Sequence, residues 1–406
     1  MVEGHLRPAR AEVDLDAIAD NAALLRRLVA PTALSAVVKA DGYGHGAVPV
    51  ALAALRGGAT WLAVALVEEG IELRQAGIEA PVLVLGEPEP DAMAEAVAHR
   101  LTLTVYTAEG VDALITVAKQ ARATGGPASV VHLKVDTGMH RLGADPDEAV
   151  ALAARLAEFA GDSGGGGGAG VLRLEGLWTH LAVADEPDNA YTADQLERFR
   201  LVRSRLAEAG VVPAVVHAAN SAGALAHPGA RLDKVRCGIS VYGYPPNPAL
   251  GPLVTQALGQ PLRPALSLRS RVVLVRELDA QERLSYGLRY RLGERSVVAT
   301  VPLGYADGVP RALSAAGGEV LIGGRRCRMA GTITMDYLMV DCGPDATVAT
   351  GDDVVLLGRQ GDEVISADDW AARLGTISYE VLTGMGARVP RVYVGGRAAS
   401  VGGGSE

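Results

Sequence analysis

Lysine is scarce in this chain: four of the 406 residues are lysines, although lysine and arginine together number 38. No basic run stands out and the net charge is −9, so the composition speaks against a nucleic-acid partner. No apolar stretch reaches the roughly 20 residues that cross a bilayer. The first ten residues also lack the apolar core of a signal peptide. These absences predict a cytoplasmic protein that contacts neither membrane nor nucleic acid.

Cysteine is equally scarce. Cys237, Cys327 and Cys342 are an odd set whose spacing fits no metal knuckle and no disulfide framework. We expect them to be small buried apolar side chains in a reducing compartment. The remaining composition, 49% hydrophobic and 21% charged, suits a chain with a sizeable folded core.

Short apolar runs alternate with stretches of helical spacing as far as about residue 243. Eight runs predict strands at 35–40, 61–66, 81–86, 101–106, 130–138, 174–180, 213–220 and 235–243. Eight strand–helix alternations over about 240 residues match an α/β fold of the TIM-type (β/α)8 barrel class. A doubly wound open sheet is the alternative, but it usually has fewer strands. We predict the barrel at residues 11–250.

A second domain follows a proline-rich linker at residues 245–252. Strand-like runs with turn signals every eight to twelve residues predict a mostly β domain at 256–397. One short helix, ADDWAARLG (367–375), interrupts it, and a flexible tail covers 398–406. The alternation in AEVDL (11–15) would suit an additional strand of this domain. The glycine-rich segment 161–170 is predicted to be a flexible surface loop.

Lys39 ends the first apolar run, in AVVKADGYGHG (36–46). Function in a barrel gathers at the C-terminal ends of the strands. A desolvated lysine there has a lowered pKa and can form a Schiff base. The loop after it can bring backbone N–H groups and a tyrosine hydroxyl to an anion, a combination that suits pyridoxal 5'-phosphate. The alternative is a lysine whose amine reaches water at the barrel rim.

Lys134 raises the same question in VHLKVDTG (131–138). Strand alternation puts it on one face with His132 and Asp136, and this face would point into the barrel. Asp136 could pair with the amine. Alternatively, carbon dioxide could convert the amine to a carbamate, an anion able to hold a nearby arginine.

Arg236, in VRCGIS (235–240), occupies another inward position near a strand end. An arginine cannot be deprotonated there, so it needs an acceptor. A pyridine nitrogen would serve, and the alternative is one of the barrel's acids. His180 and His217 each end a strand-like run at the same end of the barrel, which favours a site there.

Ten ordered motifs extend this picture over both domains: AVVKADGYGHG, LKVDTGMHRLG, LEGLWTHLAVADE, HAANSAGAL, VRCGISVYGYPP, LSYG, LGYADGVPR, ITMDY, SYEVL and RVPR. In these motifs the chain resembles alanine racemase, a fold-type III pyridoxal-phosphate enzyme, nearly end to end. The resemblance implies interconversion of L- and D-alanine, which supplies D-alanine for peptidoglycan. It also implies a head-to-tail homodimer in which each site joins one barrel to the partner's β domain.

The resemblance implies two catalytic bases. Lys39 carries the cofactor as a Schiff base, and Tyr286 is supplied by the partner subunit. Bases on opposite faces of the α-carbon allow a proton to leave one face and return on the other. A free tyrosine has a pKa near 10, so Tyr286 needs help, which the resemblance assigns to His180.

The resemblance further implies a set of supporting residues. Tyr43, Ser221, Gly238, Ile239 and Tyr379 match positions that hold the phosphate, and Arg236 matches the arginine at the pyridine nitrogen. Lys134 matches a lysine often carbamylated in the family, Arg141 the arginine that it orients near the phenolic oxygen, and His180 and His217 histidines that support the site. Met335 and Asp336 match positions near the substrate carboxylate and the dimer contact, and Tyr305, Arg311 and Asp185 match positions along the substrate path.

Three positions depart from the family's usual pattern. Thr332 stands where an arginine is usual, Tyr337 where glutamine is common, and His140 where glycine is common. The lost arginine removes a positive charge, so serine or another small amino acid could be accepted alongside alanine.

Two other functions compete. A decarboxylase, or a racemase of larger amino acids, could use the same barrel, but LSYG has a tyrosine where family decarboxylases use a cysteine and acidic groups. A barrel that only binds the cofactor would lack the β domain.

Overall fold

The computed structural model describes residues 6–160 and 170–396, and the chain divides into two compact units. Among the described residues, one unit comprises 18–42 and 47–263, and the other combines 6–17, 43–46 and 264–396. The predicted boundaries shift accordingly: residues 11–17 group with the second unit, and position 256 lies inside helix α10 (Gly251–Leu258). The tail predicted at 398–406 and almost all of the loop predicted at 161–170 lie outside the described residues.

The first unit is the predicted barrel, with one parallel strand at each of the eight predicted runs. Its strands pair in the orders β4-β3-β2-β9 and β5-β6-β7-β8. A bridge between Leu83 and Thr102 joins the two sets on one side, and the backbone N–H of Arg236 donates to the carbonyl of Ala219 at 3.0 Å on the other. The strands are β2 (Ala33–Val37), β3 (Trp61–Val64), β4 (Val82–Val84), β5 (Leu103–Val105), β6 (Ser129–Lys134), β7 (Leu172–Trp178), β8 (Val215–His217) and β9 (Lys234–Cys237).

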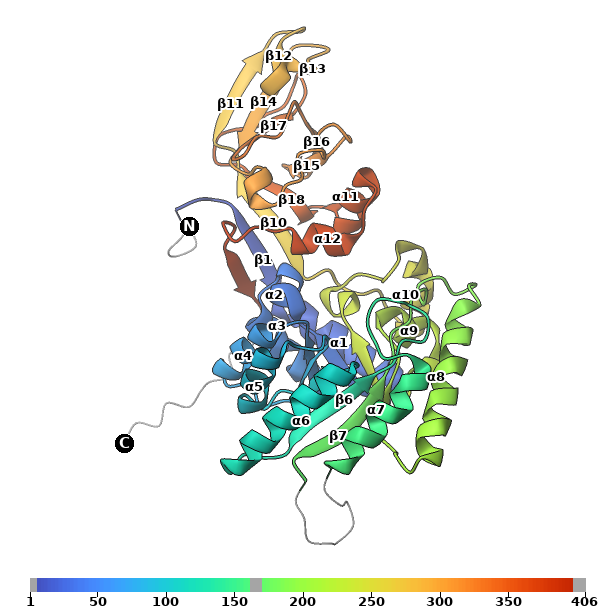
Figure 1. Cartoon of the computed structure of the whole chain (residues 1–406). Helices are drawn as coiled ribbons and strands as arrows, with labels where there is room; N and C mark the ends of the chain where they lie inside the picture. The colour runs from blue at the N-terminus through green and yellow to red at the C-terminus, as the bar shows by residue number, and fades with distance from the viewer. Residues whose placement is uncertain (1–5, 161–169, 397–406) are drawn as a thin grey trace, which may run out of the picture. The chain divides into compact units, whose positions relative to one another are not determined.

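Helices cover the outside of these strands (Figure 1). In α1 (Leu15–Val29) the side chains of Ile18, Ala22, Leu25 and Val29 recur at helical spacing, and all are buried. None of the helices in residues 6–160 and 170–396 is long and apolar enough to cross a membrane. The others in this unit are α3 (Ala47–Arg56), α4 (Val67–Gln75), α5 (Pro90–Ala98), α6 (Ala108–Ala123), α7 (Pro146–Glu158), α8 (Tyr191–Glu208), α9 (Ser221–Ala226) and α10.

The second unit is built on a mostly antiparallel sheet in the order β11-β14-β17-β16-β15-β18-β10-β1-β20, with β19 beside β18. The strand suggested by AEVDL is present as β1, which pairs antiparallel with β10 and parallel with β20. Its strands are β1 (Arg10–Asp14), β10 (Leu266–Arg271), β11 (Leu274–Leu278), β14 (Ser296–Val301), β15 (Glu319–Ile322), β16 (Arg325–Met329), β17 (Leu338–Asp341), β18 (Asp353–Gln360), β19 (Glu363–Ile365) and β20 (Arg391–Val394).

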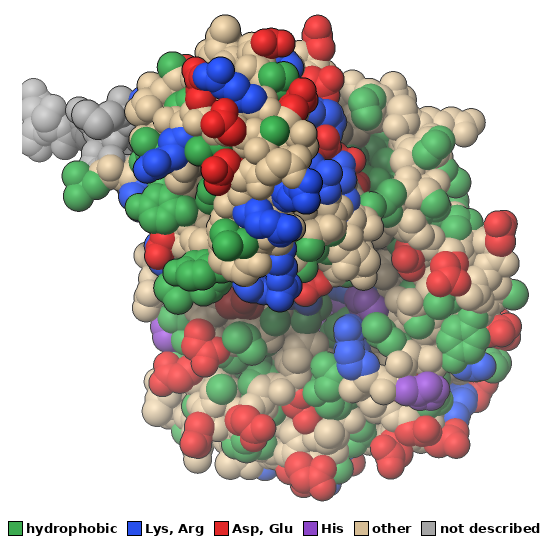
Figure 2. Space-filling model, turned by 90° about the horizontal axis from the view of Figure 1, so that it is seen from above, with side chains coloured by type: hydrophobic (Ala, Val, Ile, Leu, Met, Phe, Trp, Pro, Cys, Tyr) green, Lys and Arg blue, Asp and Glu red, His purple; other side chains and the backbone are tan. Residues whose placement is uncertain are grey.

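Smaller elements complete the second unit. The predicted helix is present as α11 (Ala367–Leu374), capped by the Ser366 side chain. A second helix, α12 (Ser378–Thr383), was not predicted. β12 (Arg283–Leu284) and β13 (Tyr290–Arg291) form a two-stranded ribbon. Acidic and basic side chains are both spread over the face of the molecule in Figure 2.

Candidate active site

Lys39 lies just after β2, at the start of the turn α2 (Lys39–Gly44). This turn is left-handed, because φ is positive at every residue from Ala40 (+52°) to Gly44 (+79°). Such backbone costs a residue with a side chain roughly 1–2 kcal/mol. A Cβ at Gly44 would also lie 2.4 Å from the carbonyl oxygen of Leu382. Strain of this kind persists where the surroundings hold it, and it concentrates at functional sites.

The amine of Lys39 is half-buried among other charges. Burial lowers its pKa, the charge of Arg141 lowers it further, and Glu69 opposes both. The Glu69 carboxylate also accepts from the backbone N–H groups of Ala40 at 2.6 Å and Ala65 at 2.7 Å. It therefore ties the turn after Lys39 to the end of β3. A lowered pKa increases the fraction of neutral, nucleophilic amine, as Schiff-base chemistry requires.

Lys134 points into the barrel, as predicted, and is 3% exposed. Its Nζ lies 4.5 Å from the centroid of the Trp178 ring. Burial, followed by the charges of Arg236 and Arg141, lowers the pKa of Lys134 to about 7. Within the described part of the chain no carboxylate lies at ion-pair distance, so the pairing with Asp136 is wrong. Above pH 7 the amine is mostly neutral, the state that reacts with carbon dioxide.

Asp136 instead organises the loop that carries Arg141. Its Oδ1 accepts hydrogen bonds from the backbone N–H groups of Gly138 at 2.8 Å, Met139 at 3.0 Å and His140 at 3.1 Å. These bonds hold the pKa of Asp136 below its usual value, although burial alone would raise it.

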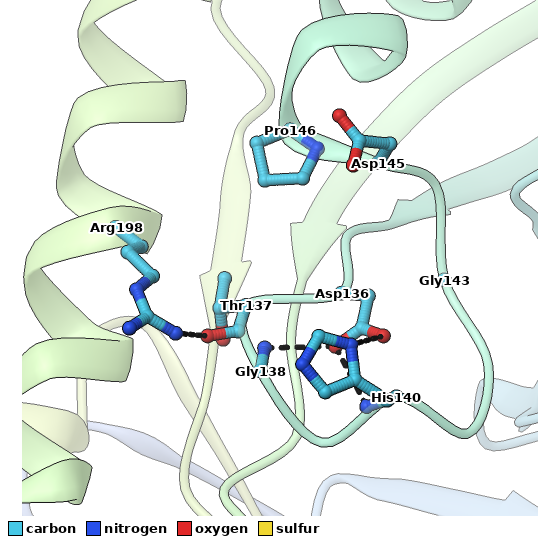
Figure 3. A pocket seen from close by; sticks show the side chains of 8 residues that line it. All are labelled: Asp136, Thr137, Gly138, His140, Gly143, Asp145, Pro146 and Arg198. Carbon is cyan, nitrogen blue, oxygen red and sulfur yellow. Dashed lines mark hydrogen bonds and ion pairs between the residues drawn. The ribbon is translucent and has the colours of Figure 1, made fainter.

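A cavity of about 370 Å³ lies beside this loop. Arg198 of α8 closes one side and donates to the carbonyl of Thr137 at 3.0 Å (Figure 3). The loop held in this way brings Arg141 close enough to lower the pKa of Lys39, Lys134 and His180.

Arg236 is held inside the barrel by neutral acceptors. Its guanidinium donates to Nδ1 of His217 at 2.7 Å and to Nδ1 of His180 at 3.3 Å. It also donates to the carbonyls of Thr179 at 2.9 Å and Ala218 at 3.0 Å. No carboxylate in residues 6–160 and 170–396 pairs with it, so the alternative of an acid partner is wrong, and the pyridine nitrogen stays a prediction. Burial lowers its pKa to about 9, which still leaves it charged at neutral pH.

The proton positions on His217 and His132 are defined, because the guanidinium of Arg236 can only donate hydrogen bonds. Nδ1 of His217 accepts from Arg236, so its Nε2–H donates to Nδ1 of His132 at 2.9 Å. His132 in turn donates from Nε2 to Glu175 at 3.1 Å. Burial is the main cause that lowers the pKa of His132, to about 4. Arg236 is thus oriented by a buried chain of neutral rings that ends at a carboxylate.

Lys234 lies on the same strand face as Arg236 and is fully buried. Its Nζ sits 3.6 Å from the centroid of the Trp61 ring and has no hydrogen-bond partner among the described residues. Burial, reinforced by the charge of Arg236, lowers its pKa well below the usual value.

We predict that Lys234→Met stabilises the fold by about 1–3 kcal/mol near neutral pH, because it removes a buried polar group without a partner. Between the lowered folded pKa and the unfolded pKa of about 10.4, only the unfolded amine holds a proton, so wild-type stability rises with pH. The advantage of the variant should therefore shrink as the pH rises. Urea midpoints at about pH 7 and about pH 9.5 measure this, and exposed Lys119→Met should show neither effect.

The residues predicted to hold a phosphate fall into two groups, one in each unit. In the barrel, the Ser221 hydroxyl accepts from the backbone N–H of Gly238 at 2.9 Å, and Ile239 follows directly. In the second unit, the rings of Tyr43 and Tyr379 lie 6.1 Å apart between centroids. Ser221, Gly238 and Ile239 therefore lie together in the barrel, and Tyr43 and Tyr379 lie together in the second unit.

Tyr286 lies in the short helix η4 (Tyr286–Leu288) of the second unit and is 74% exposed. Positive φ at Ser285 and Leu288 flanks it. Thr332, where the family usually has arginine, donates from its hydroxyl to the carbonyl of Tyr286 at 2.9 Å. This threonine therefore holds the backbone that presents Tyr286.

The other predicted residues of the second unit lie nearby in its loops. Tyr305, Met335 and Tyr337 are each 42% to 51% exposed, and the backbone N–H of Tyr305 donates to the carbonyl of Thr334 at 3.0 Å. Asp336 forms an ion pair with Arg388 at 2.7 Å. Arg311 is exposed in the same unit, whereas Asp185 belongs to the barrel unit. The substrate path that would join them stays a prediction.

Three residues around the site had no predicted role. His132 was placed on the inward face but not connected to Arg236. Trp178 stacks on His217 with 5.5 Å between ring centroids, and its ring lies beneath both Lys134 and Arg236. In the sequence, only its place just before Thr179 and His180, at the end of a strand-like run, pointed to the site. Glu69 is the third residue of α4, where an acid that accepts from the N-cap N–H of Leu66 is a local helix-start signal, but its contact with Ala40 has no local signal.

Together the barrel gathers Lys39, Lys134, Arg141 and Arg236 around one region, without an ion-paired carboxylate on any of them among the described residues. A desolvated amine next to fixed cations is suited to an anionic ligand that carries an electrophilic carbon.

Comparison with known proteins agrees with this chemistry. Residues 13–246 match the family described as alanine racemase, N-terminal domain, and residues 265–393 match the alanine racemase C-terminal domain. The alanine racemase of Symbiobacterium thermophilum is 48% identical over 390 residues, covering 96% of this chain and 98% of that protein. The alanine racemase of Thermobifida fusca is 44% identical over 387 residues, covering 95% and 98%.

Solved structures agree as well. The alanine racemase of the D-cycloserine producer Streptomyces lavendulae superposes with a TM-score of 0.86 at 39% identity, over 97% of this chain and 98% of that one. The Bacillus anthracis enzyme with bound L-Ala-P gives 0.86 at 38% identity, over 96% of each chain. The chain, with its TIM-type barrel and mostly β C-terminal domain, therefore belongs to the alanine racemase family of enzymes.

Proposed function

We propose that this enzyme interconverts L- and D-alanine with pyridoxal 5'-phosphate as its cofactor, and that it supplies D-alanine for peptidoglycan. The observation that carries the proposal is the desolvated Lys39 amine grouped with the desolvated Lys134 amine and the cations Arg141 and Arg236. The names of the relatives, at up to 48% identity, support the choice of alanine.

The residues present fit this cofactor. Lys39 would hold its aldehyde carbon, and Arg236 would donate to its pyridine nitrogen. Ser221, Gly238 and Ile239 from the barrel, with Tyr43 and Tyr379, would bind the phosphate, and Arg141 would meet the phenolic oxygen. When bound, the group disperses the negative charge left when the α-proton is removed.

Two bases would move the proton. Lys39, with its lowered pKa, accepts it on one face of the α-carbon, and the Tyr286 oxygen serves the other face. Nδ1 of His180 accepts from Arg236, so its Nε2–H remains to donate to the Tyr286 oxygen. That hydrogen bond would stabilise the phenolate form of Tyr286. Arg236 would donate a hydrogen bond to the ring nitrogen and keep its own proton.

A homodimer would supply Tyr286 from the partner subunit. Tyr286, Leu288, Tyr305, Met335 and Tyr337 are large exposed side chains of the second unit, and exposed apolar groups of this kind suit a protein partner. A second copy of the chain, docked head to tail, would cover them and complete each site.

Racemisation in deuterated water tests the proposal. Purified protein with pyridoxal phosphate should convert L-alanine into deuterated alanine of both hands, as chiral chromatography with mass detection would show. Serine, lysine and arginine measured in parallel test whether Thr332 has broadened the substrate range. Exchange with one of these and none with alanine would assign another substrate, and no exchange with any of them would contradict a racemase.

A further inference from the structure

Cys327 and Cys342 face each other across neighbouring strands. β16 and β17 pair antiparallel, with Arg328 opposite Asp341 and Met329 opposite Val340. The same register puts Cys327 opposite Cys342. The two cysteines are therefore directly opposed cross-strand neighbours, which their spacing in the sequence did not reveal.

The pair occupies the type of position where opposing side chains come closest. The backbone N–H of Ala330 donates to the carbonyl of Met339 at 2.8 Å, which identifies that pair as hydrogen-bonded. Pair types alternate along an antiparallel ladder, so Cys327 and Cys342, three steps away, form a non-hydrogen-bonded pair. Cα atoms of such pairs are about 4.5 Å apart, within the range of about 4.4–6.8 Å that a disulfide spans.

Each thiol donates to a carbonyl of its own strand, Cys327 Sγ to Arg325 at 3.8 Å and Cys342 Sγ to Val340 at 3.7 Å, and each also shifts the pKa of the other. Both residues are buried, as the composition predicted, but 6% of Cys327 and 5% of Cys342 is exposed, against 0% of Cys237 in the barrel. The pair therefore retains a small opening to solvent that the third cysteine lacks.

We propose that Cys327 and Cys342 are a reversible thiol–disulfide pair that low-molecular-weight disulfides oxidise. The Cys327 thiolate attacks one sulfur of the small disulfide, which forms a mixed disulfide and releases the other half as a thiolate. The Cys342 sulfur then attacks Cys327 Sγ, loses its proton to water and releases the second half as a thiolate, and both released thiolates take up protons from water. The protein loses two hydrogens and the small disulfide becomes two thiols, so atoms and electrons balance.

The order of the two steps follows from the surroundings of each sulfur. The neighbouring Cys342 thiol lowers the pKa of Cys327, and the charge of Arg325 adds to this against the effect of burial. The same contact and burial raise the pKa of Cys342. Cys327 is thus the attacking thiolate and Cys342 the resolving thiol.

The bond would close the base of a hairpin. Residues 330–337 connect β16 to β17 and carry Thr332, Met335, Asp336 and Tyr337. A covalent link between positions 327 and 342 would restrict this loop, so oxidation would stiffen the part of the second unit that presents these side chains.

The folded protein, incubated with oxidised glutathione, tests the pair. We expect the intact mass to fall by two hydrogens, a tryptic peptide linking Cys327 to Cys342, and full reversal by dithiothreitol. The melting temperature should rise by about 4 °C or more. Cys327→Ser and Cys342→Ser should abolish the internal bond, and only Cys342→Ser should accumulate the mixed disulfide. Cys237→Ser serves as the matched control and should oxidise like the wild type.

Two outcomes would overturn the proposal. One is a folded wild-type protein that retains both thiols after long incubation, while the urea-unfolded protein oxidises. The other is a wild-type protein that stops at the glutathione adduct, which would show that the sulfurs cannot reach each other. Neither outcome depends on the proposed racemase activity.

Discussion

Replacement of Lys39 by alanine should abolish racemisation and covalent retention of the cofactor. The amine is one of the two proposed bases and the only proposed covalent anchor, so turnover should fall by at least about 10⁴-fold. Chiral chromatography measures the first effect. Borohydride reduction followed by peptide mass spectrometry measures the second, because wild-type protein should carry the reduced cofactor on Lys39.

Lys119→Ala is the matched control, since Lys119 is an exposed lysine of α6. It should keep both activity and the adduct on Lys39. Full activity of Lys39→Ala would contradict the proposed mechanism, and an adduct on Lys134 in the wild type would reassign the anchor to the second inward-pointing lysine. A thermal melt of Lys39→Ala separates loss of chemistry from loss of fold.

Tyr286→Phe should lower racemisation by about 10²- to 10⁴-fold, because it removes the oxygen that carries the second proton and keeps the ring. The reduced adduct on Lys39 should be unchanged. Lys39 alone can still remove and return a proton on its own face, so one enantiomer of alanine should exchange its α-proton for deuterium without inversion. Tyr337→Phe, at a tyrosine of the same unit that is 49% exposed, is the control and should invert alanine at a normal rate.

Mixing the two inactive variants tests whether the site is shared between subunits. If Tyr286 comes from the partner, a dimer of one Lys39→Ala chain and one Tyr286→Phe chain contains one intact site. Random reassociation should then restore about a quarter of wild-type activity. If both bases come from the same chain, no combination contains an intact site and the mixture stays inactive.

Local patterns were enough to locate the main elements of the fold. The eight barrel strands coincide with eight apolar runs, because a strand buried on both faces is a short continuous apolar segment whatever its neighbours are. Alternation along β6 and β9 was likewise enough to point Lys134 and Arg236 into the barrel, since successive side chains of a strand face opposite sides. The order of motifs, which is also a property of the chain alone, indicated the family.

Hydrogen-bond and ion-pair partners that come from distant segments of the chain could not be predicted from such local patterns. Arg236 was expected to meet an acid or a pyridine nitrogen; the described protein groups around it are His217, His180 and two carbonyls. Asp136 was a possible partner for Lys134, yet its carboxylate is used by three backbone N–H groups of its own loop.

The sequence by itself therefore determined the strands, the inward faces and the family, because these depend on periodicity and on the identity of residues within short segments. The tertiary structure alone decided that Glu69 clamps the turn after Lys39 and that Cys327 faces Cys342. Each of these depends on which strands or loops become neighbours. That choice is made by burial and backbone pairing over the whole domain, and no local stretch of sequence contains it.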